Sequence, residues 1–142
     1  MDLYAESSAV LAWLFREPSE ERVEAALGQA DSIVASHLTV VESERALVRA
    51  VSMGRLTESE GADRRAQLAS VVTRWNLLRL EAEVIERAGR RFPGEPLRTL
   101  DALHLASALA ARAAVPGLAM LSLDGRVRRS ATELGFDVVP EV

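Results

Sequence analysis

Five short apolar runs, separated by longer amphipathic segments, constrain the fold of this chain more than any other feature of its sequence. Short apolar runs bounded by polar or turn residues are typical of buried strands, whereas apolar positions three and four residues apart are typical of helices. Strands are therefore expected at residues 3–5, 32–36, 76–80, 118–123 and 136–140.

The segments between these runs have helical spacing, and several end at a proline or a glycine. Helices are therefore expected at residues 8–16, 19–30, 39–53, 57–75, 81–92, 99–114 and 126–134. Strands that alternate with helices favour an α/β fold, in which a mostly parallel sheet is covered on both faces. No linker or repeat divides the chain, and its length is typical of one domain, so we predict a single domain over residues 1–142.

The composition narrows the chemistry that the chain can perform. It contains no cysteine, which excludes disulfides and thiolate metal sites and leaves oxygen and histidine as the possible metal ligands. The N-terminus has no basic region, and its longest apolar run, residues 9–15, is too short to span a bilayer. We therefore expect a cytoplasmic protein that is not associated with a membrane. The net charge of −4 argues against a protein that binds nucleic acid over much of its surface.

Two acidic residues directly follow predicted strands. Glu6 follows residues 3–5, and Asp124 follows residues 118–123. Each has a structural explanation, because an acid at the start of a helix interacts favourably with the helix dipole, and an aspartate before Gly125 is an ordinary turn and cap residue.

Two further acids lie early in predicted helices. Glu42 fits a capping box with Thr39, which would be a purely structural use. Asp101 falls in the first turn of the helix at 99–114, which Thr99 can cap, but the surrounding face is apolar and an acid there is harder to explain structurally. His104 lies one turn after Asp101, and we expect it to be a packed side chain, or one held in orientation behind the ligands, rather than a metal ligand.

The four acids together indicate more than any one of them does. In a doubly wound sheet, the ends of the strands and the starts of the helices converge on one edge. Two carboxylates about 4 Å apart repel by roughly 4 kcal/mol at an effective dielectric constant near 20, so four of them need cations. Because the chain has neither cysteine nor lysine, Mg²⁺ or Mn²⁺ is the natural partner. Such a site is typical of enzymes that cut phosphodiester bonds.

Four segments resemble PIN-domain ribonucleases in their order and spacing, in particular the VapC-type toxins of bacterial toxin–antitoxin pairs. The segments are LYAESSAVLAWL, SHLTVVESERAL, RTLDALHLASAL and LSLDGRVRRSATELGFDVV. The resemblance extends from residue 3 to residue 139. It implies a three-layer α/β/α fold with a sheet of four to five mostly parallel strands.

The resemblance also implies a function, a cofactor and partners. It implies an endoribonuclease that uses Mg²⁺ or Mn²⁺, is inhibited by a cognate antitoxin protein and forms a homodimer. Catalytic and metal-binding roles are implied for Glu6, Glu42, Asp101 and Asp124, and supporting roles for Ser8 and Ser122. Contacts to the RNA backbone are expected from Arg16, Arg45 and Arg98. Most members of the family have aspartate at the position of Glu6, so the metal preference and the mode of binding at this residue stay open.

Three alternatives remain to be weighed against a ribonuclease. A catalytically inactive PIN-fold binding module would have lost acids, yet all four positions keep a carboxylate. A receiver-like phosphotransfer domain generally uses a lysine to balance the phosphate, and this chain has none. A DNA nuclease of related fold usually carries extra helical insertions, for which 142 residues leave little room.

Overall fold

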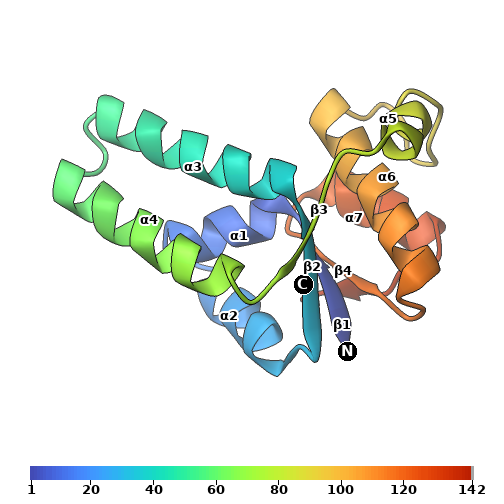
Figure 1. The fold of residues 1–142 in the computed structure, drawn as a ribbon, viewed down its shortest axis with the longest axis horizontal. Coiled ribbons are helices and arrows are strands. Elements are labelled where there is room, and N and C mark those ends of the chain that lie inside the picture. The colour runs from blue at the N-terminus through green and yellow to red at the C-terminus, as the bar shows by residue number, and fades with distance from the viewer. Residues whose placement is uncertain (142) are drawn as a thin grey trace.

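A single sheet of five parallel strands forms the centre of the computed structural model, which describes residues 1–141 (Figure 1). The strands lie in the order β3-β2-β1-β4-β5. They are β1 (Asp2–Ala5), β2 (Ser32–Ser36), β3 (Asn76–Leu78), β4 (Ala119–Leu121) and β5 (Val138–Val139). This arrangement confirms the predicted three-layer α/β/α fold with a parallel sheet.

Helices cover both faces of the sheet. In Figure 1, α1 to α4 lie to the left of the strands, and α5 to α7 lie to the right. The helices are α1 (Ser7–Leu14), α2 (Glu20–Gln29), α3 (His37–Ser52), α4 (Glu58–Val72), α5 (Ala82–Ala88), α6 (Thr99–Ala114) and α7 (Gly125–Glu133). None of the helices in residues 1–141 is long and apolar enough to cross a membrane.

The side chains of β1 alternate between two hydrophobic cores, one on each face of the sheet. Leu3 and Ala5 belong to the core beneath α1 to α4, whereas Tyr4 belongs to the core beneath α5 to α7. A strand that is buried on both faces has no polar alternation, which explains why the strands stand out in the sequence as continuous apolar runs.

The connections of the sheet create a crevice at its carboxyl edge, the edge where the strands end. From β1 the chain moves outward to β2 and β3, then crosses back to β4 on the other side of β1. The ends of β1 and β4 are therefore neighbours, with Ala5 paired with Leu121. Ligands of open parallel sheets bind at such a switch in strand order.

The structure corrects the expected start of α3. This helix begins at His37 rather than at residue 39, because the hydroxyl of Ser36 accepts a hydrogen bond from the Leu38 N–H at 3.0 Å and caps the helix. Thr39 is consequently inside the helix, where it is buried and donates to the carbonyl of Ala5. The capping box expected for Thr39 and Glu42 is wrong, so Glu42 has no capping function.

A capping box does occur at the start of α4. The Thr57 hydroxyl accepts from the Glu60 N–H, and the Glu60 carboxylate accepts from the Thr57 N–H, both at 3.0 Å. The expected cap at Thr99 is also wrong, because Thr99 is the first helical residue of α6 and Arg98 takes the cap position.

Candidate active site

The four predicted acids line one cavity of about 410 Å³ at the carboxyl edge of the sheet. Glu6 directly follows β1, and two residues separate Asp124 from the end of β4, while Glu42 comes from α3 and Asp101 from the first turn of α6. Elements that are far apart in the sequence thus bring these carboxylates together. We call this space the acid cavity.

Glu6 is the N-cap of α1 and lies almost completely buried. Its Oε2 accepts a hydrogen bond from the Ser8 N–H at 2.8 Å. Its Oε1 accepts from the hydroxyls of Ser8 at 2.6 Å and of Ser122 at 2.5 Å. The helix-start explanation of Glu6 therefore describes its hydrogen bonding correctly, and the same bonds hold the carboxylate at the cavity wall.

Ser8 and Ser122 connect the first acid to the last. The Ser8 hydroxyl accepts from the backbone N–H groups of Leu123 and Asp124, at 2.8 and 3.1 Å. The Ser122 hydroxyl also accepts from the Asp124 N–H at 3.1 Å. These two hydroxyls lock the loop after β4 against the loop after β1.

Asp124 also caps a helix. Its Oδ1 accepts from the N–H groups of Arg126 and Val127 at the start of α7, at 2.9 and 3.1 Å. Its Oδ2 accepts from Arg98 Nη2 at 3.2 Å. One oxygen of this carboxylate therefore stabilises the helix, while the other faces a cation.

Arg98 joins two of the acids. Its Nε and its backbone N–H both donate to Asp101 Oδ2 at 3.2 Å, in addition to the bond from Nη2 to Asp124. The hydrogen bond to Asp101, with the charges of Asp101 and Asp124, raises the pKa of Arg98. Arg98, one of the three arginines predicted to contact RNA, thus lies beside the acids and supplies positive charge to the cavity.

Glu42 belongs to a separate hydrogen-bond network. Its Oε1 accepts from the Ser7 hydroxyl at 2.6 Å and contacts His104 Nε2 at 2.7 Å. Burial opposes ionisation, but the hydrogen bonds of His104 and Ser7 outweigh it and lower the pKa of Glu42. His104 in turn contacts the Tyr4 hydroxyl through Nδ1 at 2.9 Å. His104 is expected from the sequence to be an oriented or packed side chain behind the ligands, whereas no local signal pointed to Ser7 or Tyr4.

The other two predicted arginines do not line the acid cavity. Arg45 lines a neighbouring cavity of about 610 Å³ that shares Leu11 and Glu42 with it. Arg49 lines the same neighbouring cavity. Arg16 is exposed just beyond the end of α1, with a backbone φ of 53°.

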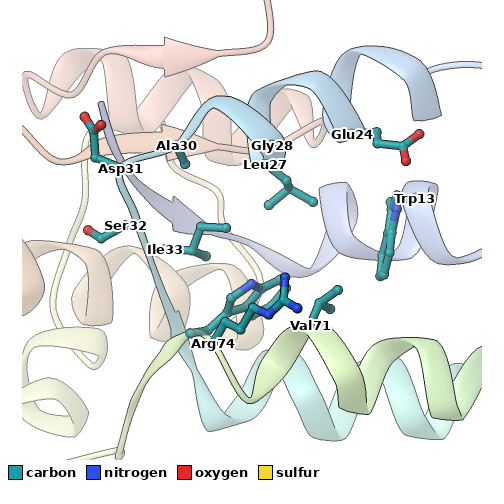
Figure 2. Close-up of a pocket in the computed structure, with 11 residues that line it drawn as sticks. Trp13, Glu24, Leu27, Gly28, Ala30, Asp31, Ser32, Ile33, Val71 and Arg74 are labelled. Atoms are coloured by element: carbon teal, nitrogen blue, oxygen red, sulfur yellow. The ribbon is translucent and has the colours of Figure 1, made fainter.

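A third cavity, of about 380 Å³, lies at the opposite edge of the sheet (Figure 2). It is formed at the start of β2 by side chains that include Trp13, Leu27, Ile33 and Val71. Figure 2 shows Leu27 and Ile33 extending into the space between α2 and α4. None of the four predicted acids lines this cavity, so the acid cavity alone gathers them.

The donor set of the acid cavity fits a hard divalent cation, because carboxylate and hydroxyl oxygens are the ligands that Mg²⁺ and Mn²⁺ prefer. Within residues 1–141, no three acidic or histidine side chains are arranged to coordinate one ion. Each carboxylate is instead turned toward protein donors. Arg98 nevertheless demonstrates that Asp101 and Asp124 can share one positive group. The chemistry of these donors therefore fits a divalent cation, although in residues 1–141 they are bonded to protein groups.

Curated relatives match this chain over nearly its whole length. Ribonuclease VapC46 of Mycobacterium tuberculosis is 34% identical over 137 residues, which are 96% of this chain and 95% of that protein. Ribonuclease VapC45 of the same species is 33% identical over 138 residues, covering 97% and 94% of the two chains.

Solved structures share the fold at low sequence identity. VapC20 of Mycobacterium tuberculosis, described as a toxin that cleaves the sarcin–ricin loop, has a TM-score of 0.70 at 15% identity and covers 98% of this chain and 99% of its own. VapBC2 from Rickettsia felis, bound to promoter DNA, has a TM-score of 0.66 at 11% identity, with 98% of both chains covered. A toxin–antitoxin complex from Klebsiella pneumoniae has a TM-score of 0.65 at 17% identity, covering 99% and 97%.

The sequence model of the PIN-domain family matches residues 3–132, which are most of the chain. With the relatives above, this match confirms the resemblance found in the sequence. The chain belongs to the PIN-domain family and, within it, to the VapC ribonucleases.

Proposed function

We propose that this chain is an endoribonuclease toxin of a type II toxin–antitoxin pair, and that it hydrolyses RNA with Mg²⁺ or Mn²⁺ in the acid cavity. The observation that carries this proposal is the convergence of four carboxylates from four elements in a chain of the VapC ribonuclease family. A bound divalent ion would supply Lewis-acid chemistry, lowering the pKa of a water molecule and offsetting the charge of the phosphate.

Two carboxylate oxygens are best suited to meet the ion or its water. Both bonds of Arg98 to Asp101 end on Oδ2, and both bonds to Glu42 end on Oε1. Within the described chain, no hydrogen bond reaches Asp101 Oδ1 or Glu42 Oε2. We assign these two oxygens to the ion and its waters, with Asp124 Oδ2 joining them when Arg98 moves away.

Glu6 has a different part in this proposal. Its two oxygens already accept three hydrogen bonds from Ser8 and Ser122, so it adds negative charge from a fixed position. Its Oε2 accepts only one of these bonds and has room for another partner, so Glu6 binds the ion through Oε2, either directly or through water.

The substrate would be held by cations around the cavity. Arg98 and Arg45 stand beside the acids and contact the phosphates of the RNA, and Arg16 would contact a more distant phosphate. In-line attack of water on phosphorus would break the bond to the 3′ oxygen, leaving 5′-phosphate and 3′-hydroxyl ends.

The partner and the site of action follow from the same family. Solved VapBC structures and a toxin–antitoxin complex share this fold, and we infer that a cognate antitoxin binds this chain and covers the acid cavity. We further infer a homodimer that acts on RNA in the cytoplasm.

The test compares wild-type chain with Asp101→Asn on labelled RNA oligonucleotides and on total cellular RNA, with Mn²⁺, with Mg²⁺ and with a chelator. We expect cleavage by the wild type with either metal and none with the chelator or the variant. Asp63→Asn, which changes an exposed aspartate of α4, is the matched control and should cleave normally.

Other outcomes distinguish the alternatives. Cleavage by Asp101→Asn at the wild-type rate would remove the acid cavity from the mechanism. Metal binding without any cleavage would favour an inactive binding module, and equal cleavage of single-stranded DNA would contradict the preference for RNA.

A further inference from the structure

His104 lies at the centre of a buried network behind Glu42. Its side chain is 2% exposed, and both of its ring nitrogens have partners. Nδ1 lies 2.9 Å from the Tyr4 hydroxyl, and Nε2 lies 2.7 Å from Glu42 Oε1 and 2.9 Å from the Ser7 hydroxyl. The Tyr4 and His104 rings meet edge to face at a centroid distance of 6.1 Å. Packing and hydrogen bonding thus fix the imidazole in one orientation.

The contact between His104 and Glu42 has a defined direction. A carboxylate can only accept hydrogen bonds, so Nε2 carries the hydrogen at the 2.7 Å contact with Glu42 Oε1. Tyr4 is completely buried, and its hydroxyl holds the other ring nitrogen, Nδ1, at 2.9 Å.

The consequence for Glu42 concerns its two oxygens. Oε1 receives the Nε2–H of His104 and the hydroxyl proton of Ser7, whereas Oε2 has no hydrogen-bond partner among the described residues. Two donors on one oxygen fix the rotation of the carboxylate. A cation in the acid cavity would therefore meet Glu42 through a single oxygen.

We propose that His104, held by Tyr4, is a positioning residue that restricts Glu42 to binding a divalent ion through Oε2 alone. This inference rests on the proposed metal site. Binding through one oxygen suits Mg²⁺ and Mn²⁺, which take six well-ordered ligands, whereas Ca²⁺ takes more ligands and often both oxygens of a carboxylate. The network therefore favours the smaller ions over Ca²⁺.

The experiment measures Mn²⁺ binding by the loss of the free-ion electron paramagnetic resonance signal, with Ca²⁺ as the competitor. In His104→Asn the shorter amide reaches the Nδ1 position but not Glu42, and we expect an affinity about 10- to 100-fold weaker with a reduced preference for Mn²⁺ over Ca²⁺. In His104→Gln the amide nitrogen takes the place of Nε2 and should restore most of the affinity. His37→Asn, the same change at the exposed second histidine, is the control and should bind as the wild type does.

Two further variants separate positioning from folding. Tyr4→Phe removes only the hydroxyl that orients His104, and we expect the same change in metal preference, with a smaller loss of affinity. Adding His104→Asn to Glu42→Gln should change the Mn²⁺ affinity by less than about twofold, because a residue that acts through Glu42 has no effect once that carboxylate is gone.

The results identify which idea fails. The positioning role is overturned if the His104→Asn and Tyr4→Phe proteins fold and bind Mn²⁺ with the affinity and preference of the wild type, whereas Glu42→Gln loses binding. Wild-type Mn²⁺ binding by both Glu42→Gln and Asp101→Asn would overturn the metal site itself, and the positioning role with it. Thermal unfolding monitors the fold, and if His104→Asn does not fold, Tyr4→Phe decides the outcome.

Discussion

Arg98 donates from Nη2 to Asp124 Oδ2 across 3.2 Å and so joins the start of α6 to the start of α7. Through Nε and its backbone N–H the same residue also holds Asp101. The arginine therefore balances two carboxylates whose ionised forms would otherwise repel each other. A divalent ion would compete with Arg98 for these carboxylates, and an RNA phosphate would compete with the carboxylates for Arg98. Arg98 is therefore the most informative residue to change.

Arg98→Gln should have opposite effects on metal and on RNA. Removing a competing cation should tighten Mn²⁺ binding about threefold to tenfold, because exposed ion pairs are modest in strength. The affinity for RNA should fall, since a phosphate contact is lost. Mn²⁺ titration and RNA binding to the metal-free protein check the two effects. Arg74→Gln, at the opposite edge of the sheet, should change neither, and weaker Mn²⁺ binding by Arg98→Gln would contradict the competition.

Asp124 should separate into a structural and a chemical role. Asparagine also caps helices, so Asp124→Asn should keep the stability of the wild type while RNA cleavage is lost. Asp124→Ala should lose cleavage and also about 0.5–2 kcal/mol of the free energy of unfolding, because the cap of α7 is gone. Urea unfolding and RNA cleavage of both variants make the comparison. Equal stability of the two variants would show that the cap contributes nothing.

Two buried serines provide a matched test of the hydroxyl contacts. Ser122 donates to Glu6 and accepts from the Asp124 N–H, whereas the Ser130 hydroxyl has no partner among residues 1–141. Ser122→Ala should therefore cost roughly 1–3 kcal/mol of the free energy of unfolding, and Ser130→Ala should stay within about 0.5 kcal/mol of the wild type. A similar cost for both would mean that packing, not hydrogen bonding, sets the effect.

The sequence predicted the sheet and the four acids because both are local signals. The strands are buried on both faces and so are continuous apolar runs, and Glu6 and Asp124 come at or just after the ends of two of these runs. Both residues turned out to be helix caps as well as members of the cavity. An acidic residue that caps a helix can therefore also belong to the acid cavity.

The hydrogen-bond partners of the acids could not be predicted in the same way. Tyr4, Ser7 and His104 meet only after β1 and α6 pack together, with about 100 residues of chain between them. The spacing of Thr39 and Glu42 predicts a capping box, yet Ser36 takes the cap position of that helix. Thr57 and Glu60 have the same spacing and do form the box. Spacing alone does not decide where a helix begins.

Glu60 gives a test of pH dependence away from the acid cavity. The backbone N–H of Thr57 and then its side chain lower the pKa of Glu60 below its ordinary value of 4.5. A lowered pKa in the folded state stabilises the protein above pH 4.5, and this stabilisation is lost as the pH falls through the lower folded value. Glu60→Gln should therefore be less stable than the wild type at pH 7, with the difference shrinking as the pH falls below 4.5. Unfolding curves at several pH values measure it, and parallel profiles would contradict it.

The arginines predicted to bind RNA should differ in their contribution to the salt dependence of binding. Arg45 lines a cavity that adjoins the acid cavity, whereas Arg16 lies beyond the end of α1 and outside both cavities. Each phosphate contact on a single strand contributes about −0.7 to the slope of log affinity against log salt concentration. We expect Arg45→Ala to reduce the slope by about this amount and Arg16→Ala to reduce it less. Fluorescence anisotropy of a labelled RNA, measured without divalent ions so that it is not cut, gives both slopes. A larger change for Arg16→Ala would place the RNA along the end of α1 instead of over α3.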